Sequence, residues 1–191
     1  MRAREATRRI VWTACFFLIG QWLLPSLSHA ATAQAIDAGA DKALDQFRSQ
    51  VAGSDEFLRT AKGYLVFPEV IQAGIGVGGQ YGEGVLRIGG RSAAYYSIKS
   101  GSIGLQFGAQ RKSIIIVFLQ DQALVEFEAK AEADNAWNVG ADGSVVLLNL
   151  GAQASINSAT INQPIVGFVF GQQGLMYNLS LQGSKISRLQ R

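Results

Sequence analysis

The spacing of apolar residues along the chain begins with a helical period. Over residues 36–51 apolar residues recur every three to four positions with charged residues between them, which predicts an amphipathic helix of about four turns. Gly53 interrupts this pattern, Ser54 is expected to cap a second short helix over residues 55–62, and Gly63 is expected at the C-cap position of that helix. The apolar face of the first helix is expected to pack on a sheet, or alternatively to lie at a membrane surface.

From Tyr64 onward the period changes to that of a strand, with apolar positions alternating with glycine or polar ones. A first short strand is expected to end at Pro68, and the glycine-rich residues 81–84 are expected to form a turn. The uninterrupted apolar run at residues 114–119 predicts a central strand buried on both faces. Further strands are expected over residues 74–78, 85–88, 102–110, 137–141, 144–150, 165–170 and 175–181.

Residues 122–133 return to helical spacing, and Asp121 is expected to cap this helix. Residues 171–174 are expected to form the turn of a hairpin near the end of the chain. Together these elements predict an α+β fold. It consists of a curled or barrel-like antiparallel sheet of about seven strands, an N-terminal helix pair and one inserted helix.

The first thirty residues have the parts of a secretory signal peptide. A stretch with four arginines precedes the apolar run at residues 10–24, which is shorter than the roughly 18–20 residues that a membrane-spanning helix needs. The bond after Ala30 has the small-x-small form of a cleavage site, and the bond after Ala35 is a second candidate. We therefore expect removal of residues 1–30, a single domain over residues 31–191, and export to the periplasm or to the outer-membrane surface.

Removal of this segment changes the charge and the available chemistry. The full chain has 17 Lys and Arg against 14 Asp and Glu, and removal leaves 13 of each, so the charge indicates no nucleic-acid partner. The only cysteine and the only histidine, Cys15 and His29, are removed as well. We therefore expect no ordinary metal site, no cofactor and no histidine-assisted nucleophile.

Residues 74–79 match the GxGxxG fingerprint of dinucleotide-binding proteins. That fingerprint requires a helix at its third glycine, so that the helix N-terminus meets the pyrophosphate. Here residues 80–84 follow, and two further glycines prevent them from beginning a stable helix. We interpret the segment as glycine-rich strands, whose bare face serves either tight packing or an apolar ligand.

Charged residues supply two sets of candidates for a functional site. Six basic residues near strand ends or on polar faces are candidates for binding an anionic headgroup, and scattered solubilising charge is the alternative interpretation: Lys62, Arg87, Arg91, Lys99, Arg111 and Lys112. Four carboxylates are candidates for hydrolysis without histidine: Glu69, Glu83, Asp121 and Asp142. Glu83 is also expected to be a solvated turn residue, and the sequence places no two of these carboxylates at catalytic separation.

Four stretches, in the same order, resemble the SYLF domain family: AKGYLVFPEVIQAGIGVGGQYGEGVL (61–86), GSIGLQFGAQRKSIIIVFL (101–119), WNVGADGSVV (137–146) and GLMYNLSLQGSKI (174–186). The motif positions of the first stretch are Gly63, Pro68, Gly74, Gly76, Gly78, Gly79, Tyr81, Gly82 and Gly84. The resemblance implies phospholipid binding without catalysis, with phosphoinositides preferred in eukaryotic members. Some eukaryotic members also bind actin, a property that we do not expect of a periplasmic protein.

The sequence therefore predicts a non-enzymatic protein of the cell envelope that associates peripherally with anionic phospholipid. Basic residues would meet the phosphates, and either the first helix or a glycine-lined sheet face would contact the acyl chains. One alternative is a small outer-membrane β-barrel, which the charged helix at residues 122–133 disfavours. The other is a histidine-free hydrolase that uses Glu83 or Asp142. The lipid and any protein partner stay open.

Overall fold

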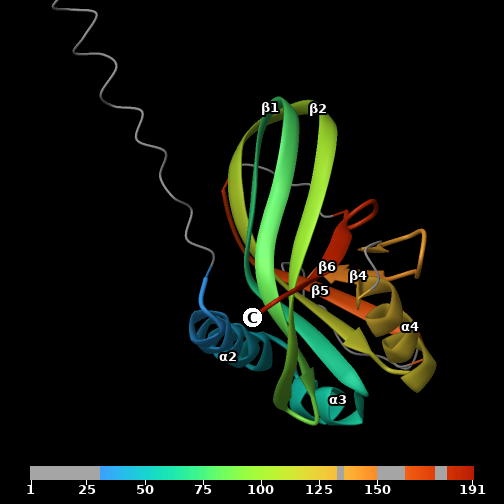
Figure 1. Ribbon diagram of the computed structural model, residues 1–191. Coiled ribbons are helices and arrows are strands. Elements are labelled where there is room, and N and C mark those ends of the chain that lie inside the picture. Colours follow the sequence, from blue (N-terminus) through green and yellow to red (C-terminus); the bar gives the residue numbers. More distant parts are fainter. Residues whose placement is uncertain (1–30, 133–135, 150–161, 175–179) are drawn as a thin grey trace, which may run out of the picture. The chain divides into compact units, whose positions relative to one another are not determined.

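The computed structural model describes residues 31–132, 136–149, 162–174 and 180–191, with only the backbone described for residues 102–107 and 149 (Figure 1). Three helices and six strands lie in these residues, and they confirm the expected α+β fold with a curled sheet, an N-terminal helix pair and one later helix. The elements are α2 (Ala33–Gln50), α3 (Ser54–Thr60), β1 (Gly63–Ile88), β2 (Arg91–Phe118), α4 (Asp121–Glu132), β3 (Trp137–Asn138), β4 (Val146–Asn149), β5 (Ile165–Gly174) and β6 (Lys185–Leu189).

β1 and β2 form one long antiparallel hairpin whose turn lies at Gly89 and Gly90, both with positive φ. The expected end of the first strand at Pro68 is wrong, because the chain continues past it. A register shift between Phe67 and Val70 accommodates the residue that lacks an N–H group. The expected turn at residues 81–84 is also wrong, since these residues pair with β2 throughout.

The hairpin bends over on itself and forms an arch, which Figure 1 shows rising away from the helices. The bend in β1 lies at Gly76, whose φ of +71° is accessible to glycine at no steric cost. The chain reverses so tightly that a Cβ atom on Gly74 would lie 2.4 Å from the Cα atom of Gly78. We call residues 74–78 of β1 and residues 102–108 of β2 the arch tip.

The two legs of β1 on either side of the bend pack against each other through glycine. A Cβ atom on Gly82 would lie 2.7 Å from the carbonyl oxygen of Glu69, and one on Gly84 would lie 2.3 Å from that of Val66. Real Cβ atoms do not approach backbone oxygen so closely, so the legs fit only without these side chains. Of the two interpretations of the glycine pattern, the geometry supports tight packing.

The sheet has a hydrophobic core on each face. On one face α2 and α3 cover Val66, Ile115 and Val117, and on the other face α4 packs with strand residues that include Ile114 and Ile116. Residues 114–118 therefore contribute alternately to both cores, which confirms the expected central strand. The apolar face of α2 is fully used in the first core, so it is not available to a membrane in this fold; it consists of Ile36, Ala40, Ala43, Leu44 and Phe47.

The helix ends differ from the expected ones in three places. α3 begins at Ser54 itself and follows Gly53, whose φ of +80° makes the break, and no side chain caps the helix. Gly63 is the first residue of β1 and does not cap α3. Asp121 is the first residue within α4 and does not precede the helix.

The remaining strands extend the sheet in the order β3-β6-β2-β5-β4. β5 runs through the expected turn at residues 171–174, and β4 pairs with it in parallel, whereas the other pairs are antiparallel. The strand expected over residues 137–141 is only β3, followed by an isolated bridge between Val139 and Gly143. Ala133, Leu150 and residues 175–179, which other expected elements include, lie outside the described residues.

The close approach of the two legs predicts the effect of adding one methyl group. Gly84→Ala should lower the free energy of unfolding by roughly 1–3 kcal/mol, because overpacking forces the backbone apart. Gly101→Ala is the matched control in the same hairpin, since no atom lies within 4 Å of a Cβ there. Denaturant unfolding of both variants measures the difference, and equal stabilities would contradict the packing described here.

Candidate functional site

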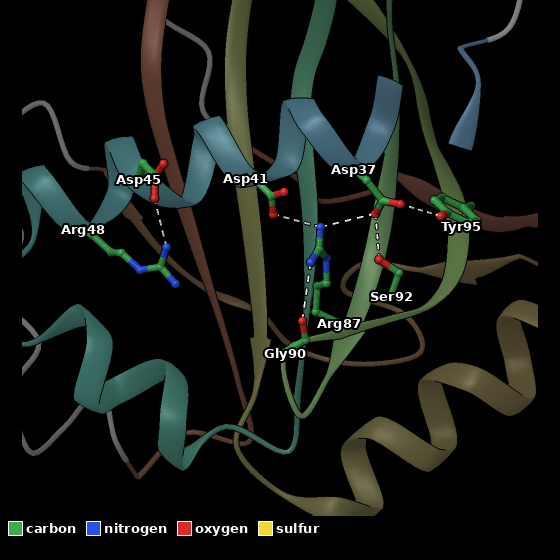
Figure 2. Close-up of polar contacts among 8 residues, drawn as sticks. All are labelled: Asp37, Asp41, Asp45, Arg48, Arg87, Gly90, Ser92 and Tyr95. Atoms are coloured by element: carbon green, nitrogen blue, oxygen red, sulfur yellow. Dashed lines mark hydrogen bonds and ion pairs between the residues drawn. The ribbon is translucent and has the colours of Figure 1, made fainter. Parts of the chain in front are cut away.

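The six basic candidates do not converge on one site. Arg87 on β1 lies against α2 and binds two of its carboxylates, with Nη2 3.3 Å from Oδ1 of Asp37 and 2.9 Å from Oδ1 of Asp41 (Figure 2). Its side chain is only 13% exposed, Nη1 donates to the carbonyl oxygen of Gly90, and Nε is buried without a hydrogen-bond partner among the described residues. Arg87 therefore joins the arch to the first helix and is not available to a phosphate.

Asp37 is the centre of this contact, because it also accepts hydrogen bonds from the hydroxyls of Ser92 and Tyr95, at 2.7 and 2.8 Å. Burial raises the pKa of Asp37, but the two hydrogen bonds and the charge of Arg87 outweigh it, and the pKa lies below its ordinary value. Stability from this carboxylate is therefore present at neutral pH and is lost as the pH falls through the lowered value.

Three other basic candidates are exposed, and the ion pairs that two of them form are weak. Lys62 lies 3.1 Å from a carboxylate oxygen of Asp121, and Arg111 lies 3.5 Å from one of Glu69. Exposed pairs of this kind contribute little to stability and leave the cations accessible to another anion. Arg91 is exposed at the start of β2, beside the hairpin turn.

Lys99 is exposed, its ammonium nitrogen lies 5.6 Å from the ring centroid of Tyr81, and it is the register partner of Lys185 on β6. Two lysines thus meet on neighbouring strands where the arch joins the sheet. Lys185 was not among the residues singled out from the sequence, because only the pairing of β2 with β6 places it there.

Lys112 differs from the other candidates, because it is buried with 2% of its surface exposed. Its ammonium donates to Oε1 of Gln72 at 3.2 Å, an oxygen that also accepts from Nε2 of Gln110. No carboxylate of the described residues pairs with it. Burial lowers the pKa of Lys112, and Oε1 of Gln110 beside it is buried without a hydrogen-bond partner. The expectation that Lys112 lies at a strand end or on a polar face is therefore wrong.

The arch tip carries an exposed apolar surface that the sequence pattern did not predict. Ile75 is 76% exposed and Val77 is 67% exposed, and Ile71 and Tyr81 lie exposed further down the two legs. These four account for most of the seven exposed large apolar side chains among the described residues, so the apolar surface is concentrated on the arch. Alternation of glycine with Ile and Val usually indicates a strand with a buried face, but here the alternating residues extend beyond both hydrophobic cores.

The sequence contains one signal for this surface, which is the absence of charge. No Asp, Glu, Lys or Arg occurs between Glu69 and Glu83 on β1, or between Lys99 and Arg111 on β2. A solvated hairpin normally carries charges on its exposed face, so a long stretch without any indicates a different environment.

The motif residues build this arch. Gly63 begins β1, and Pro68 packs against α2, where a Cβ atom on Gly39 would lie 3.0 Å from its ring. The other motif residues form the bend and the second leg of β1: Gly74, Gly76, Gly78, Gly79, Tyr81, Gly82 and Gly84.

The four carboxylates considered for hydrolysis are all engaged by basic residues. Glu69 and Asp121 pair with Arg111 and Lys62 as described above. Asp142 accepts from Lys130 at 2.6 Å and from the backbone N–H of Asn138, and these hydrogen bonds lower the pKa of Asp142 to about 2. A general acid needs a raised pKa, so Asp142 has the opposite property.

Glu83 is not the solvated turn residue that the sequence indicated. Its side chain is 9% exposed, and its Oε1 atom accepts from the hydroxyl of Tyr81 at 2.7 Å and from Nη2 of Arg191 at 2.8 Å. Burial and the hydrogen bond to Glu83 raise the pKa of Tyr81 to about 12, so its hydroxyl stays a donor at neutral pH.

A family of known proteins resembles the second half of the chain. The model of a family described as Ysc84, Las17-binding protein actin regulator, matches residues 99–191, which include most of β2 and every later element. No curated protein matches the chain. Among the described residues, no helix is both long enough and apolar enough to cross a membrane.

The buried ammonium predicts an unusual gain of stability. Lys112→Met should raise the free energy of unfolding by roughly 1–3 kcal/mol, because an uncompensated buried charge is replaced by an apolar chain of similar length. Because the pKa is lower in the folded state, wild-type stability should rise as the pH increases toward the ordinary value of 10.5, and the variant should lack this rise.

The matched control is Lys99→Met, which removes an exposed charge from the same strand and should change stability by at most about 0.5 kcal/mol. Thermal or denaturant unfolding between pH 7 and pH 10 measures both effects. A Lys112→Met variant less stable than wild type would contradict the description of Lys112 as a buried, uncompensated charge.

Proposed function

We propose that this domain, whose residues 99–191 belong to the Ysc84 (SYLF) family, binds phospholipid membranes peripherally through the arch tip. The family match confirms the resemblance found in the sequence. The observation that carries the proposal is the exposure of Ile75 and Val77 within a long hairpin segment that contains no charge. The proposed function is binding without catalysis.

Insertion of the arch tip is favoured by its exposed apolar side chains and by its lack of charge. Complete transfer of an Ile or Val side chain out of water is favourable by roughly 1.5–3 kcal/mol. A charged side chain in the hydrocarbon would oppose this gain by several kcal/mol, and none lies on the tip. Backbone groups of β1 and β2 pair with each other as far as the bend, which reduces the cost of removing them from water.

Basic residues lie where phosphates would be if the tip enters the membrane. Lys99 faces Tyr81 in the register, and Tyr81 is four positions from Val77, a rise of about 13 Å along the strand. An apolar tip buried to the acyl boundary would place Lys99, its neighbour Lys185 and Arg111 at headgroup level. This arrangement favours anionic over zwitterionic lipid.

The partner proposed for this chain is a lipid surface of the cell envelope. The family description names an actin regulator. The N-terminal segment is expected to direct export, however, and an exported protein meets envelope lipid and not cytoskeletal partners. The first helix takes no part in the proposed contact, since its apolar face lies in the core.

The proposal predicts that binding depends on the apolar tip. Replacement of both Ile75 and Val77 by serine should weaken binding to vesicles of phosphatidylcholine and phosphatidylglycerol by at least about tenfold, because much of the transfer free energy is lost. Flotation of the protein comprising residues 31–191 measures the bound fraction. Val125→Ser is the control, since Val125 is 62% exposed but lies on α4 and not on the arch. Equal flotation of wild type and the double variant, or no flotation of wild type at low salt, would refute the proposal.

A second variant separates the electrostatic contribution from the apolar one. Lys99→Gln combined with Lys185→Gln should reduce flotation on anionic vesicles, with each lysine contributing about 1 kcal/mol. The same variant should bind vesicles of phosphatidylcholine alone as wild type does. A loss that is equal on both vesicles would show that the lysines support the fold and do not meet phosphate.

A further inference from the structure

Glu83 makes one further contact, with the start of the first helix. Its second carboxylate oxygen, Oε2, accepts a hydrogen bond at 3.1 Å from the backbone nitrogen of Ala31, the first described residue. The two groups are 52 positions apart in the chain. Ala31 directly follows the bond that has the small-x-small form of a cleavage site.

We propose that the bond between Ala30 and Ala31 is the processing site, and that the nitrogen facing Glu83 is the terminal ammonium of the mature protein. Hydrolysis by a signal peptidase of the export machinery adds water across this bond. The carboxylate stays on Ala30, and the amine, protonated at neutral pH, stays on Ala31. The proposal rests on the signal peptide expected from the sequence and not on the lipid-binding function.

The geometry supports this bond because it keeps the start of α2 complete. Thr32 is the N-cap of the helix, and its hydroxyl accepts from the backbone nitrogen of Ala35 at 3.2 Å. A mature chain that begins at Ala31 retains this cap and the whole first turn. The cap satisfies a backbone donor that has no partner within the helix.

The second candidate bond, after Ala35, would be damaging. Cleavage there removes Thr32 and the first helical turn, and leaves Ile36 as the terminal residue. Ile36 is buried with 2% of its surface exposed, so a charged amine would be formed in an apolar contact and next to the positive end of the helix dipole.

The carboxylate of Glu83 is suited to receive an ammonium. It is largely buried, and the charge that it faces within the described residues is the guanidinium of Arg191 on Oε1, with the hydroxyl of Tyr81 on the same atom. Oε2 accepts only from Ala31 among these residues. Processing converts that neutral N–H donor into a charged one, which makes a shorter and stronger hydrogen bond.

Export of the full chain tests the position of the processing site. The 191-residue protein is expressed in a bacterium with a Sec pathway, recovered from the periplasm and measured by intact mass spectrometry. The expected mass is that of residues 31–191. A mass that corresponds to a start at Ile36 or at any other residue, or to a chain that retains residues 1–30, would overturn the proposal.

A thermodynamic cycle tests the ion pair independently of the peptidase and of lipid. Residues 31–191 with a free amino terminus are compared with the same protein acetylated at Ala31, each with Glu83 and with Glu83→Gln. Acetylation should lower Tm by about 2–4 °C in the presence of Glu83, and much less with Glu83→Gln. Equal effects of acetylation in both backgrounds, or no effect in either, would overturn the pairing. Failure of vesicle flotation would leave both readouts unchanged, so the two proposals fail separately.

Discussion

The structure depends on the direct contact between the two legs of β1, which is possible only because glycine stands at the contact positions. Gly82 and Gly84 let one leg approach the backbone of the other, and Gly74 and Gly76 let the chain reverse at the tip. Without this contact β1 and β2 would form a long, straight and largely solvated ribbon, and isolated ribbons of this kind are only marginally stable. The glycine pattern therefore encodes the shape of the arch.

The arch has a fixed base and a projecting tip. Arg87 holds the base against α2 through Asp37 and Asp41, and residues 114–118 lie between two cores. The tip lies beyond both cores and is apolar, which is unfavourable in water and favourable at a lipid interface. The proposed membrane contact gives this exposed surface a function, and Lys99 and Lys185 provide charge at the level where headgroups would lie.

The sequence predicted the parts of the fold whose signals are local. Helical spacing located α2 and α4, and the run 114–119 indicated the central strand. Pro68 and the glycines at residues 81–84 led to wrong predictions, because such residues usually end strands. Here a register shift accommodates Pro68, and the glycines allow the two legs of β1 to pack closely. The sequence could not distinguish the basic candidates that support the fold from those that stay accessible. The partners of Arg87 are about 50 positions away, and the burial of Lys112 depends on strand register.

The environment of the arch tip at a membrane tests its proposed insertion most directly. The chain from residue 31 onward contains no cysteine, so Ile75→Cys and Val125→Cys each provide one attachment point for a polarity-sensitive fluorophore. Addition of anionic vesicles should shift the emission at position 75 toward that of an apolar environment and leave position 125 unchanged. An unchanged spectrum at position 75 under conditions where the protein binds vesicles would contradict insertion of the arch tip.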